Sequence, residues 1–264
     1  MASGTIHHPN PIIEVSHVCT RFGDAVVHED VNLSIMSGEI FAIAGGNGSG
    51  KSTLLREIIG LHAQAEGTIR LFGQDVAALR EQGAQNIYRR LGVMFQQGAL
   101  FSSLTLAENV AVPLKEHTDI SSELIRDIVA VKIATVELPM DSADKFPSEL
   151  SGGMRRRAAL ARAIVMDPEL IFLDEPTAGL DPIIAAGFDA LVLQLKAVLG
   201  LTVVMVTHDL DSLWRTADRV AVLGNGTILG VGTMQELAES RDPIIHEYFH
   251  GPRGRAAQSQ YGVS

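Results

Sequence analysis

The chain begins with short apolar runs separated by polar residues or glycine, a pattern typical of β-strands. The third run leads directly into glycines, and from Gly50 to Leu61 apolar residues recur at helical spacing, which predicts a helix. A stretch rich in Gln and Arg, Gln82–Arg90, is expected to be exposed. The strands predicted in this part are Ile12–Val15, Val31–Ile35, Ile40–Ala44 and Gly67–Gly73.

The middle of the chain, from about Gln97 to Ile164, is mostly helical in pattern, and strand-like runs return after it. The last of these runs contains Asn225 and Gly226, a strong signal for a hairpin turn. Apolar strands that alternate with helices indicate an α/β fold whose largely parallel sheet is covered on both faces. The helical stretch would then be an insertion between two halves of that sheet. The later predicted strands are Leu170–Asp174, Thr202–His208 and Arg219–Gly232.

Composition narrows the function classes. The 264 residues carry 21 Lys and Arg against 31 Asp and Glu, a net charge of −10. So acidic a chain is not expected to bind nucleic acid through a broad surface. The single cysteine, Cys19, excludes an intrachain disulfide and a zinc site built from a cysteine cluster.

The sequence predicts neither a membrane span nor an export signal. The longest stretch without a charged residue, Leu91–Ala107, has 17 residues and is interrupted by Gln, Ser and Thr. A spanning helix needs about 20 predominantly apolar residues. The first residues lack a basic segment followed by an apolar one. A role at a membrane would therefore require docking onto another protein.

The segment Gly45–Thr53 reads GGNGSGKST, which fits the phosphate-binding pattern G-x-x-x-x-G-K-[ST] between a strand and a helix. Its glycines allow backbone N–H groups to turn toward phosphate oxygens, and the helix N-terminus adds positive potential. Lys51 would reach the β- and γ-phosphates, and the Ser52 hydroxyl would hold Mg²⁺. The alternative, a glycine-rich turn without a ligand, does not explain the matching flanks. The expected nucleotide contacts in this loop are Gly45, Gly46, Asn47, Gly48, Ser49, Gly50, Lys51, Ser52 and Thr53.

In the segment LIFLDEPTAGLDP, Leu170–Pro182, two carboxylates follow the apolar run LIFL. Asp174 lies at the C-terminal end of the predicted strand, where ligands collect in open α/β sheets. An aspartate at this place can hold the Mg²⁺ shell, and the adjacent Glu175 can polarise an attacking water. An isolated pair of this kind would ordinarily be a solvated strand end, but the phosphate loop favours the catalytic interpretation.

A second glycine turn occurs in ELSGGMRRRAALARAI, Glu149–Ile164. Ser151, Gly152 and Gly153 precede an alanine-rich helix, so backbone N–H groups and a helix N-terminus could bind a phosphate. One phosphate cannot occupy two distant turns of one chain. The economical arrangement is a head-to-tail homodimer in which each chain's second turn covers the nucleotide of the other. The alternative is an ordinary serine N-cap.

The order of these motifs, ending with GLD and a strand that leads to His208, resembles that of the nucleotide-binding subunit of ABC transporters over nearly the whole chain. The resemblance implies a P-loop NTPase fold of the ABC type. This fold has a mostly parallel sheet core, an N-terminal antiparallel β subdomain and an inserted α-helical subdomain. The implied cofactors are ATP and Mg²⁺. The expected division is an ATP-binding core with the β subdomain at 1–96 and 165–250, a helical subdomain at 97–164 and a flexible tail at 251–264.

The resemblance also implies roles at matching positions. Phe22 would stack on adenine, Gln96 would sense Mg²⁺ and the transport partner, Asp181 would contact the opposite monomer, and His208 would contact the γ-phosphate. On residue type alone, Phe22 is a half-buried aromatic and His208 a strand-end histidine, and these interpretations stay open. The expected catalytic residues are Glu175, His208 and Lys51; the metal-associated residues are Ser52, Gln96 and Asp174; the nucleotide contacts outside the phosphate loop are Phe22, Gln96, Ser151, Gly152, Gly153, Asp174 and Asp181.

A narrower resemblance is to the ATPases of Mla-type, Mce-associated lipid transport systems. It rests on Phe95–Thr118, on LSGG followed by Met154, on Leu199–Leu210 and on RDPIIHEYFHG near the C-terminus. Met154 replaces the usual glutamine of the broader family and Gly46 replaces a common proline; neither change removes a phosphate ligand. This resemblance implies phospholipid movement between bacterial membranes, a permease, a periplasmic Mce-domain protein, a small STAS-domain protein and a place on the cytoplasmic face of the inner membrane.

Two other functions remain as alternatives. One is an ABC ATPase that serves another solute. The other is a soluble ABC protein that acts on nucleic acid, which the acidic composition, the single phosphate loop and the lack of sustained heptads disfavour. Within the segment Gln97–Pro113, Leu100, Phe101 and Leu104 are expected to be exposed in part as a docking surface for a permease helix.

Overall fold

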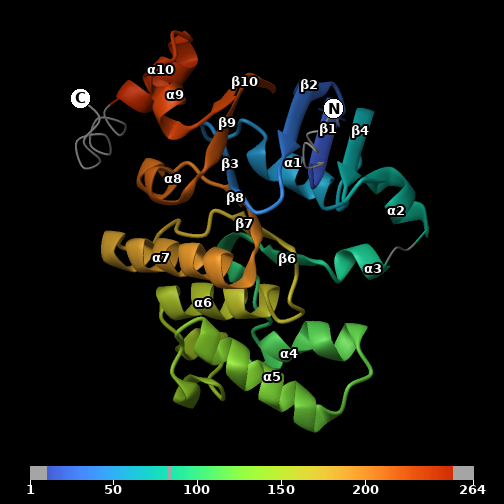
Figure 1. The fold of residues 1–264 in the computed structure, drawn as a ribbon, viewed down its shortest axis with the longest axis vertical. Helices are drawn as coiled ribbons and strands as arrows, with labels where there is room; N and C mark the ends of the chain where they lie inside the picture. Colours follow the sequence, from blue (N-terminus) through green and yellow to red (C-terminus); the bar gives the residue numbers. More distant parts are fainter. Residues whose placement is uncertain (1–10, 83–84, 252–264) are drawn as a thin grey trace, which may run out of the picture.

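The computed structural model describes residues 11–82 and 85–251. The expected tail therefore lies, apart from Gly251, outside the described residues. Two β-sheets lie toward one end of the molecule, and helices α4 (Leu106–His117), α5 (Ser122–Thr135) and α6 (Gly152–Ala163) lie toward the other (Figure 1). This is the α/β fold expected from the sequence.

The smaller sheet is antiparallel, with strand order β2-β1-β4-β5. Its hairpin is longer than predicted, because the runs at 12–15 and 31–35 are only the buried ends of two long strands. Toward the hairpin turn most residues of both strands are exposed, and polar residues such as Thr20, Arg21 and Glu29 interrupt the apolar pattern. The bounds are β1 (Ile13–Phe22), β2 (Ala25–Ile35), β4 (Glu66–Leu71) and β5 (Gln74–Asp75).

The larger sheet has the order β10-β9-β3-β8-β7-β6. Its neighbouring strands from β9 to β6 are parallel, and β10 pairs antiparallel with β9 through the predicted turn at Asn225–Gly226. The sequence did not predict β6, a run of only four residues that becomes a strand by pairing with β7. The bounds are β3 (Ile40–Ala44), β6 (Leu91–Met94), β7 (Leu170–Asp174), β8 (Thr202–Val206), β9 (Arg219–Gly224) and β10 (Thr227–Gly232).

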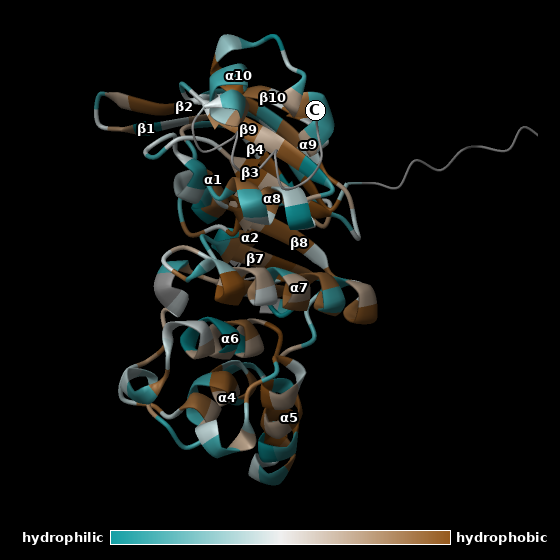
Figure 2. Cartoon of the chain, turned by 90° about the vertical axis from the view of Figure 1, so that its left-hand side faces the viewer, coloured by the Kyte–Doolittle hydropathy of each residue, from teal (hydrophilic) through white to brown (hydrophobic). Residues whose placement is uncertain are grey.

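The large sheet divides the interior into two apolar clusters. All five residues of β3 are buried, and they alternate between the clusters: Phe41 and Ile43 pack with α1 (Lys51–Ile58), whereas Ile40 and Ala42 face the other cluster. Such a strand is apolar at every position because both faces of the sheet are covered. Figure 2 shows this hydrophobic colouring along the strands, with hydrophilic residues on α1 and α8 (Leu210–Thr216).

The predicted helices in the middle of the chain begin where side chains cap them. The Ser121 and Ser151 hydroxyls accept from backbone N–H groups at the starts of α5 and α6, and Thr105 forms a capping box on α4. In the stretch expected to be exposed, Ile87 is instead buried. The other helices are α2 (Val76–Gln82), α3 (Gln85–Tyr88), α7 (Pro182–Leu199), α9 (Met234–Ala238) and α10 (Pro243–His250); short 3₁₀ turns are η1 (Gln96–Gly98), η2 (Met140–Ser142) and η3 (Pro147–Glu149).

One helix within the described ranges, α7, is long and apolar enough by length and composition to cross a membrane, with a mean hydropathy of 1.6. Only one face of the helix packs into the protein, since 33% of it is buried. Phe188, Leu191 and Val192 lie in the larger apolar cluster, and the carboxylate of Asp189 is hydrogen-bonded inside the protein to Ser212 of α8. Ile183 and Val198 of the same helix are exposed.

Candidate functional site

The phosphate loop connects β3 to α1 and is shaped by its glycines. Gly45, Gly48 and Gly50 have φ angles of 148°, 77° and 98°, a range that favours glycine. A Cβ atom at Gly45 would lie 2.2 Å from the carbonyl oxygen of Leu223. No side chain caps the start of α1 at Gly50, so the first N–H groups of the helix are free to bind an anion.

Lys51 is folded back onto this loop. Its Nζ donates to the carbonyl oxygens of Gly45 at 2.9 Å and Gly46 at 2.7 Å, and the side chain is buried. Burial lowers the pKa of Lys51, and the negative charges of Glu175 and Asp174 oppose this shift. The ammonium is thus held by the neutral carbonyl oxygens of Gly45 and Gly46 and lies near two carboxylates. An anionic ligand could draw it away from the carbonyl oxygens.

Ser52 and Asp174, from α1 and the end of β7, meet although they are far apart in sequence. The Ser52 hydroxyl donates to Asp174 Oδ1 at 3.0 Å. Burial raises the pKa of Asp174, the hydrogen bond from Ser52 lowers it, and the charge of Glu175 raises it further. A cation at this pair would offset the cost of the buried carboxylate, and a hydroxyl with a carboxylate oxygen suits Mg²⁺, which takes its other ligands from substrate and water.

Glu175 and His208 also come together. His208 Nδ1 lies 2.8 Å from Glu175 Oε1, and the other carboxylate oxygen, Oε2, is buried with no hydrogen-bond partner among the described residues. The backbone of Glu175 has a φ of 48°, and its N–H donates to the carbonyl of Val206 at 2.8 Å. Strained backbone held in this way is common where a side chain must point at a substrate.

Lys51, Ser52, Glu175 and His208 share one cavity of about 570 Å³. Asp174 is absent from its lining and is linked to it by the hydrogen bond from Ser52. Gly45, Gly46 and Ser49 are also absent, and they line two adjoining hollows. The lining residues are Val27, Asn47, Gly48, Gly50, Lys51, Ser52, Thr53, Gln96, Glu175 and His208.

The remaining predicted residues lie apart from this cavity within one chain. The exposed ring of Phe22 stacks on the His62 ring with 4.7 Å between centroids. The hydroxyl of Ser151 accepts from Met154 N–H as a helix cap, and Asp181 caps α7. Gly152 and Gly153 lie against Leu180 and Ile184 of the segment after β7.

Two residues near the site were not singled out from the sequence. Tyr248 of α10 lines the hollows beside the loop, and its buried hydroxyl lies near the N–H of Gly45 without reaching hydrogen-bond geometry. Arg156 of α6 is buried and donates to the carbonyl of Ala178 at 3.1 Å. Neither position has a local sequence signal, because each is set by how distant helices pack.

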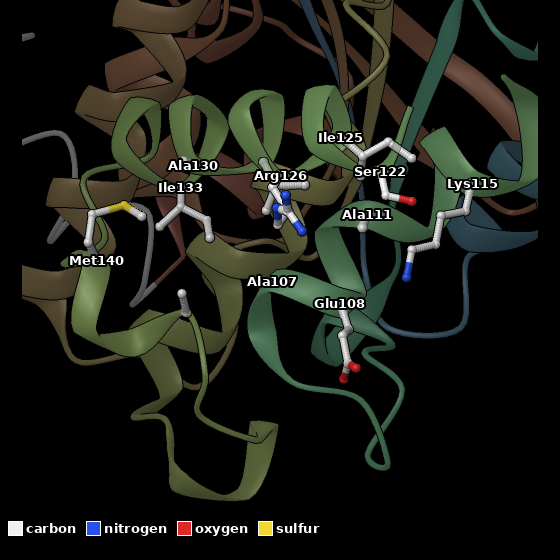
Figure 3. A pocket seen from close by; sticks show the side chains of 12 residues that line it. Ala107, Glu108, Ala111, Lys115, Ser122, Ile125, Arg126, Ala130, Ile133 and Met140 are labelled. Carbon is white, nitrogen blue, oxygen red and sulfur yellow. The ribbon is translucent and has the colours of Figure 1, made fainter. Parts of the chain in front are cut away.

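A separate groove of about 310 Å³ lies between α4 and α5 (Figure 3). Its floor is apolar and includes Ala111, Ile125, Val129 and Ile133, and Glu108, Lys115 and Arg126 also line it. It contains none of the phosphate-loop residues and belongs to the inserted helices.

Comparisons with known proteins agree with this geometry. A model of the ABC transporter family matches residues 28–178. The chain is 38% identical over 250 residues to the intermembrane phospholipid transport system ATP-binding protein MlaF of Haemophilus influenzae, covering 95% of this chain and 94% of that protein. It is 39% identical over 241 residues to the probable ribonucleotide transport ATP-binding protein mkl of Mycobacterium tuberculosis, covering 91% of this chain and 67% of that one.

Solved structures show the same architecture. The dimeric ATP-binding cassette MJ0796 in a post-hydrolysis state with ADP and Pi has a TM-score of 0.77 at 32% identity, covering 84% of this chain and 98% of that one. The cbiO1 protein of Clostridium perfringens, part of an ABC transporter complex, has a TM-score of 0.79 at 28% identity, covering 96% and 99%. The chain therefore belongs to the ABC transporter family and is the ATP-hydrolysing cassette of a transporter.

Proposed function

We propose that this cassette hydrolyses ATP to drive phospholipid movement between the membranes of a bacterial envelope, from the cytoplasmic face of the inner membrane. The observation that carries the proposal is the nearly end-to-end match to the MlaF relatives. It covers 94% of the Haemophilus influenzae protein and 89% of the Escherichia coli one. Among the sequence segments that resemble lipid-transport ATPases, Phe95–Thr118 lies where the inserted helices begin.

Transport of another solute is the second candidate. The mycobacterial relatives, whose name specifies ribonucleotide transport, are as similar in percentage identity, but the chain covers only 67% of their length. The cassette itself carries the ATP-hydrolysing motifs, so its sequence indicates ATP hydrolysis more directly than the identity of the transported solute. The larger share of the relatives' length that the chain covers favours the phospholipid candidate.

In the proposed site, Lys51 leaves the carbonyl oxygens of Gly45 and Gly46 and binds the β- and γ-phosphates. The free N–H groups at the start of α1 complete the phosphate cradle. Ser52 and Asp174 would hold Mg²⁺, and Gln96 lies on the same cavity. When bound, the ion neutralises charge on the phosphate oxygens.

Hydrolysis then depends on Glu175. Its unpartnered Oε2 is available to accept a proton from an attacking water, and Oε1 is held by His208. His208 would turn toward the γ-phosphate when nucleotide arrives, which frees Glu175 for this task. Phe22 would stack on adenine, and the partner's Ser151, Gly152, Gly153 and Asp181 would complete each site across a head-to-tail dimer. The single chain supports this last point, because these residues lie outside its own phosphate cavity.

The proposed assembly contains an integral-membrane permease, a periplasmic Mce-domain lipid-binding protein and a small STAS-domain protein. It can be tested by purifying the cassette with its permease and identifying bound lipid by mass spectrometry. We expect phospholipid to co-purify with the complex. We also expect the complex to move phospholipid between labelled vesicles and the Glu175→Gln complex not to do so. Binding and ATP-driven movement of a ribonucleotide with no lipid would favour the second candidate and contradict the first.

A further inference from the structure

A fully buried polar cluster lies beside the phosphate loop. It consists of Thr20 from β1, His28 from β2 and Glu57 from α1, none of which has exposed surface. The Thr20 hydroxyl donates to Glu57 Oε1 at 2.6 Å and lies 2.9 Å from His28 Nδ1. His28 Nε2 lies 3.2 Å from the carbonyl oxygen of Gly50. We propose that this cluster positions the phosphate loop, with His28 as a positioning residue for phosphate binding.

Both ring nitrogens of His28 face polar atoms. The Thr20 hydroxyl, which donates to Glu57 Oε1, lies beside Nδ1. The Gly50 carbonyl, which can only accept, lies beside Nε2, so this contact is a hydrogen bond when Nε2 carries the proton. Glu57 Oε2 lies 3.3 Å from Nδ1 and has no hydrogen-bond partner among the described residues.

The contact with Gly50 orients the peptide that joins Gly50 to Lys51, the first peptide of the phosphate-binding helix start. The Gly50 carbonyl accepts from both His28 and the Leu54 N–H, the latter at 2.9 Å. In a trans peptide the carbonyl and the next N–H point in opposite directions. Holding the carbonyl toward His28 therefore directs the Lys51 N–H toward the cavity, where the cradle requires a donor.

The fit around Gly50 leaves little freedom. A Cβ atom on Gly50 would lie 2.5 Å from His28 Nε2, and Gly50 has a φ of 98°. Thr20 and His28 face each other across the hairpin, and the pairing of β1 with β2 shifts register on both sides of Thr20. The irregular hairpin thus presents both side chains to α1 and to the loop at one point.

Stability does not explain the cluster. A buried polar cluster contributes little compared with well-packed apolar residues of similar volume, because its groups lose their hydration. What it adds is direction, since each hydrogen bond requires its partner at a set distance and angle. A directed contact is useful where the orientation of one peptide decides whether an N–H meets a phosphate oxygen.

The test uses the full chain with paired substitutions at position 28 in a Glu57→Gln background, so that no variant leaves a buried carboxylate beside an altered partner. His28→Gln places an N–H near the position of Nε2 and keeps a donor toward Gly50. His28→Asn places its N–H near the position of Nδ1 and loses that donor. Calorimetry measures the affinity for Mg-ATP and for Mg-tripolyphosphate, which has no base, and thermal melting measures stability.

We expect the Gln variant to keep the affinity of the Glu57→Gln parent for both ligands within about twofold, and the Asn variant to lose about tenfold for both, as when one charge-assisted hydrogen bond is weakened. Equal affinities in the two variants would overturn the proposal. So would a loss for ATP alone, because it would place the effect at the base. If the affinity for both ligands falls in proportion to the melting temperature in both variants, His28 has only a structural role and the proposal is overturned.

This inference rests on the proposed phosphate site, and Lys51→Ala separates the two failures. If Lys51→Ala leaves tripolyphosphate binding intact, the site itself is wrong. If Lys51→Ala abolishes binding while the Asn and Gln variants at position 28 do not differ, the site stands and only the role of His28 is refuted.

Discussion

At the scale of single residues, the site depends on polar atoms that lack partners. Glu175 has one carboxylate oxygen on His208 and another that is buried without a hydrogen bond. A buried acceptor in this state is costly unless a ligand uses it. The positive φ of Glu175 adds to this cost. Both features suit a residue whose partners, a water molecule and the nucleotide, arrive only when substrate binds.

Glu175→Gln is therefore expected to bind ATP and hydrolyse it about 10²–10⁴-fold more slowly, since an amide cannot accept the proton of the attacking water. The ATP-bound dimer should accumulate, because cleavage is what allows it to open. Phosphate release and size-exclusion chromatography with ATP measure the two effects. Asp211→Asn, at the start of α8, is a control for a nearby charge change. An undiminished rate in the Gln variant would refute the assignment.

Asp189 predicts a pH dependence of stability. Burial raises its pKa to about 6, against hydrogen bonds from Ser212 and Arg215 that lower it. The folded protein thus binds this proton more tightly than the unfolded chain. The group's stabilising contribution is complete below its unfolded pKa of 3.8 and is lost as the pH rises through about 6.

Between pH 7 and pH 5 this carboxyl should add about 1 kcal/mol to the free energy of unfolding. Asp189→Asn should lack that increment, because an amide does not titrate. Urea unfolding of both proteins at pH 5, 6 and 7 gives the slope of unfolding free energy against pH for each. The difference between the two slopes isolates Asp189, because other titrating groups contribute equally to both. Parallel pH profiles would contradict the role of Asp189.

At the scale of elements, the segment between η1 and α4 combines anchored and exposed residues. The Asn109 side chain accepts from the Phe101 N–H at 2.7 Å and donates to the Phe101 carbonyl at 3.0 Å, while Phe101 as a residue is 52% exposed. Leu100 and Leu104 are partly buried, so the expected exposure of all three is only partly right. A rigid backbone that displays one aromatic ring is suited to docking.

Phe101→Asp is expected to leave the isolated cassette folded, with a melting temperature within about 2 °C of the original, because an exposed substitution costs little. It should abolish co-purification with the permease and lipid transport. Leu106→Asp, only five residues away but fully buried, is the matched control and should lower the melting temperature strongly. Intact permease binding by a well-folded Phe101→Asp protein would defeat the docking proposal.

At the scale of the whole molecule, the two glycine turns predicted to bind phosphate lie apart in one chain. The phosphate loop lies at the carboxyl ends of the parallel strands, whereas Ser151 starts α6 and does not line the phosphate cavity. Two chains in head-to-tail arrangement would bring the phosphate loop of each to the Ser151 turn of the other. The dimeric MJ0796 cassette with ADP and Pi is a precedent for the assembly.

Mixing Lys51→Ala chains with Ser151→Arg chains tests this arrangement. In a head-to-tail heterodimer both defects fall on one site and the other site is intact, so hydrolysis should rise above that of either homodimer. Differently tagged chains and tandem affinity purification give the heterodimer, and phosphate release gives its rate. A proven heterodimer with no more activity than the homodimers would exclude composite sites.

Local signals along the chain determined most of the site. The phosphate loop was predictable because a left-handed glycine backbone between strand and helix has a distinct sequence, and Asp174 because a buried strand ends in a charge. The helical character of the middle of the chain was predictable, and Ser151, considered as an ordinary N-cap, does cap α6. The hairpin at Asn225–Gly226 followed from turn chemistry alone. Each of these depends on contacts within a few residues.

Tertiary structure alone decided the strand order, the strand at Leu91–Met94 and the full length of the first hairpin. It also decided the cluster of Thr20, His28 and Glu57 and the place of Tyr248 beside the phosphate loop. In sequence, the first three are ordinary polar residues of two strands and a helix. They become a buried network only when the hairpin packs on α1, because burial and hydrogen bonding between distant segments are set by the packing of whole elements.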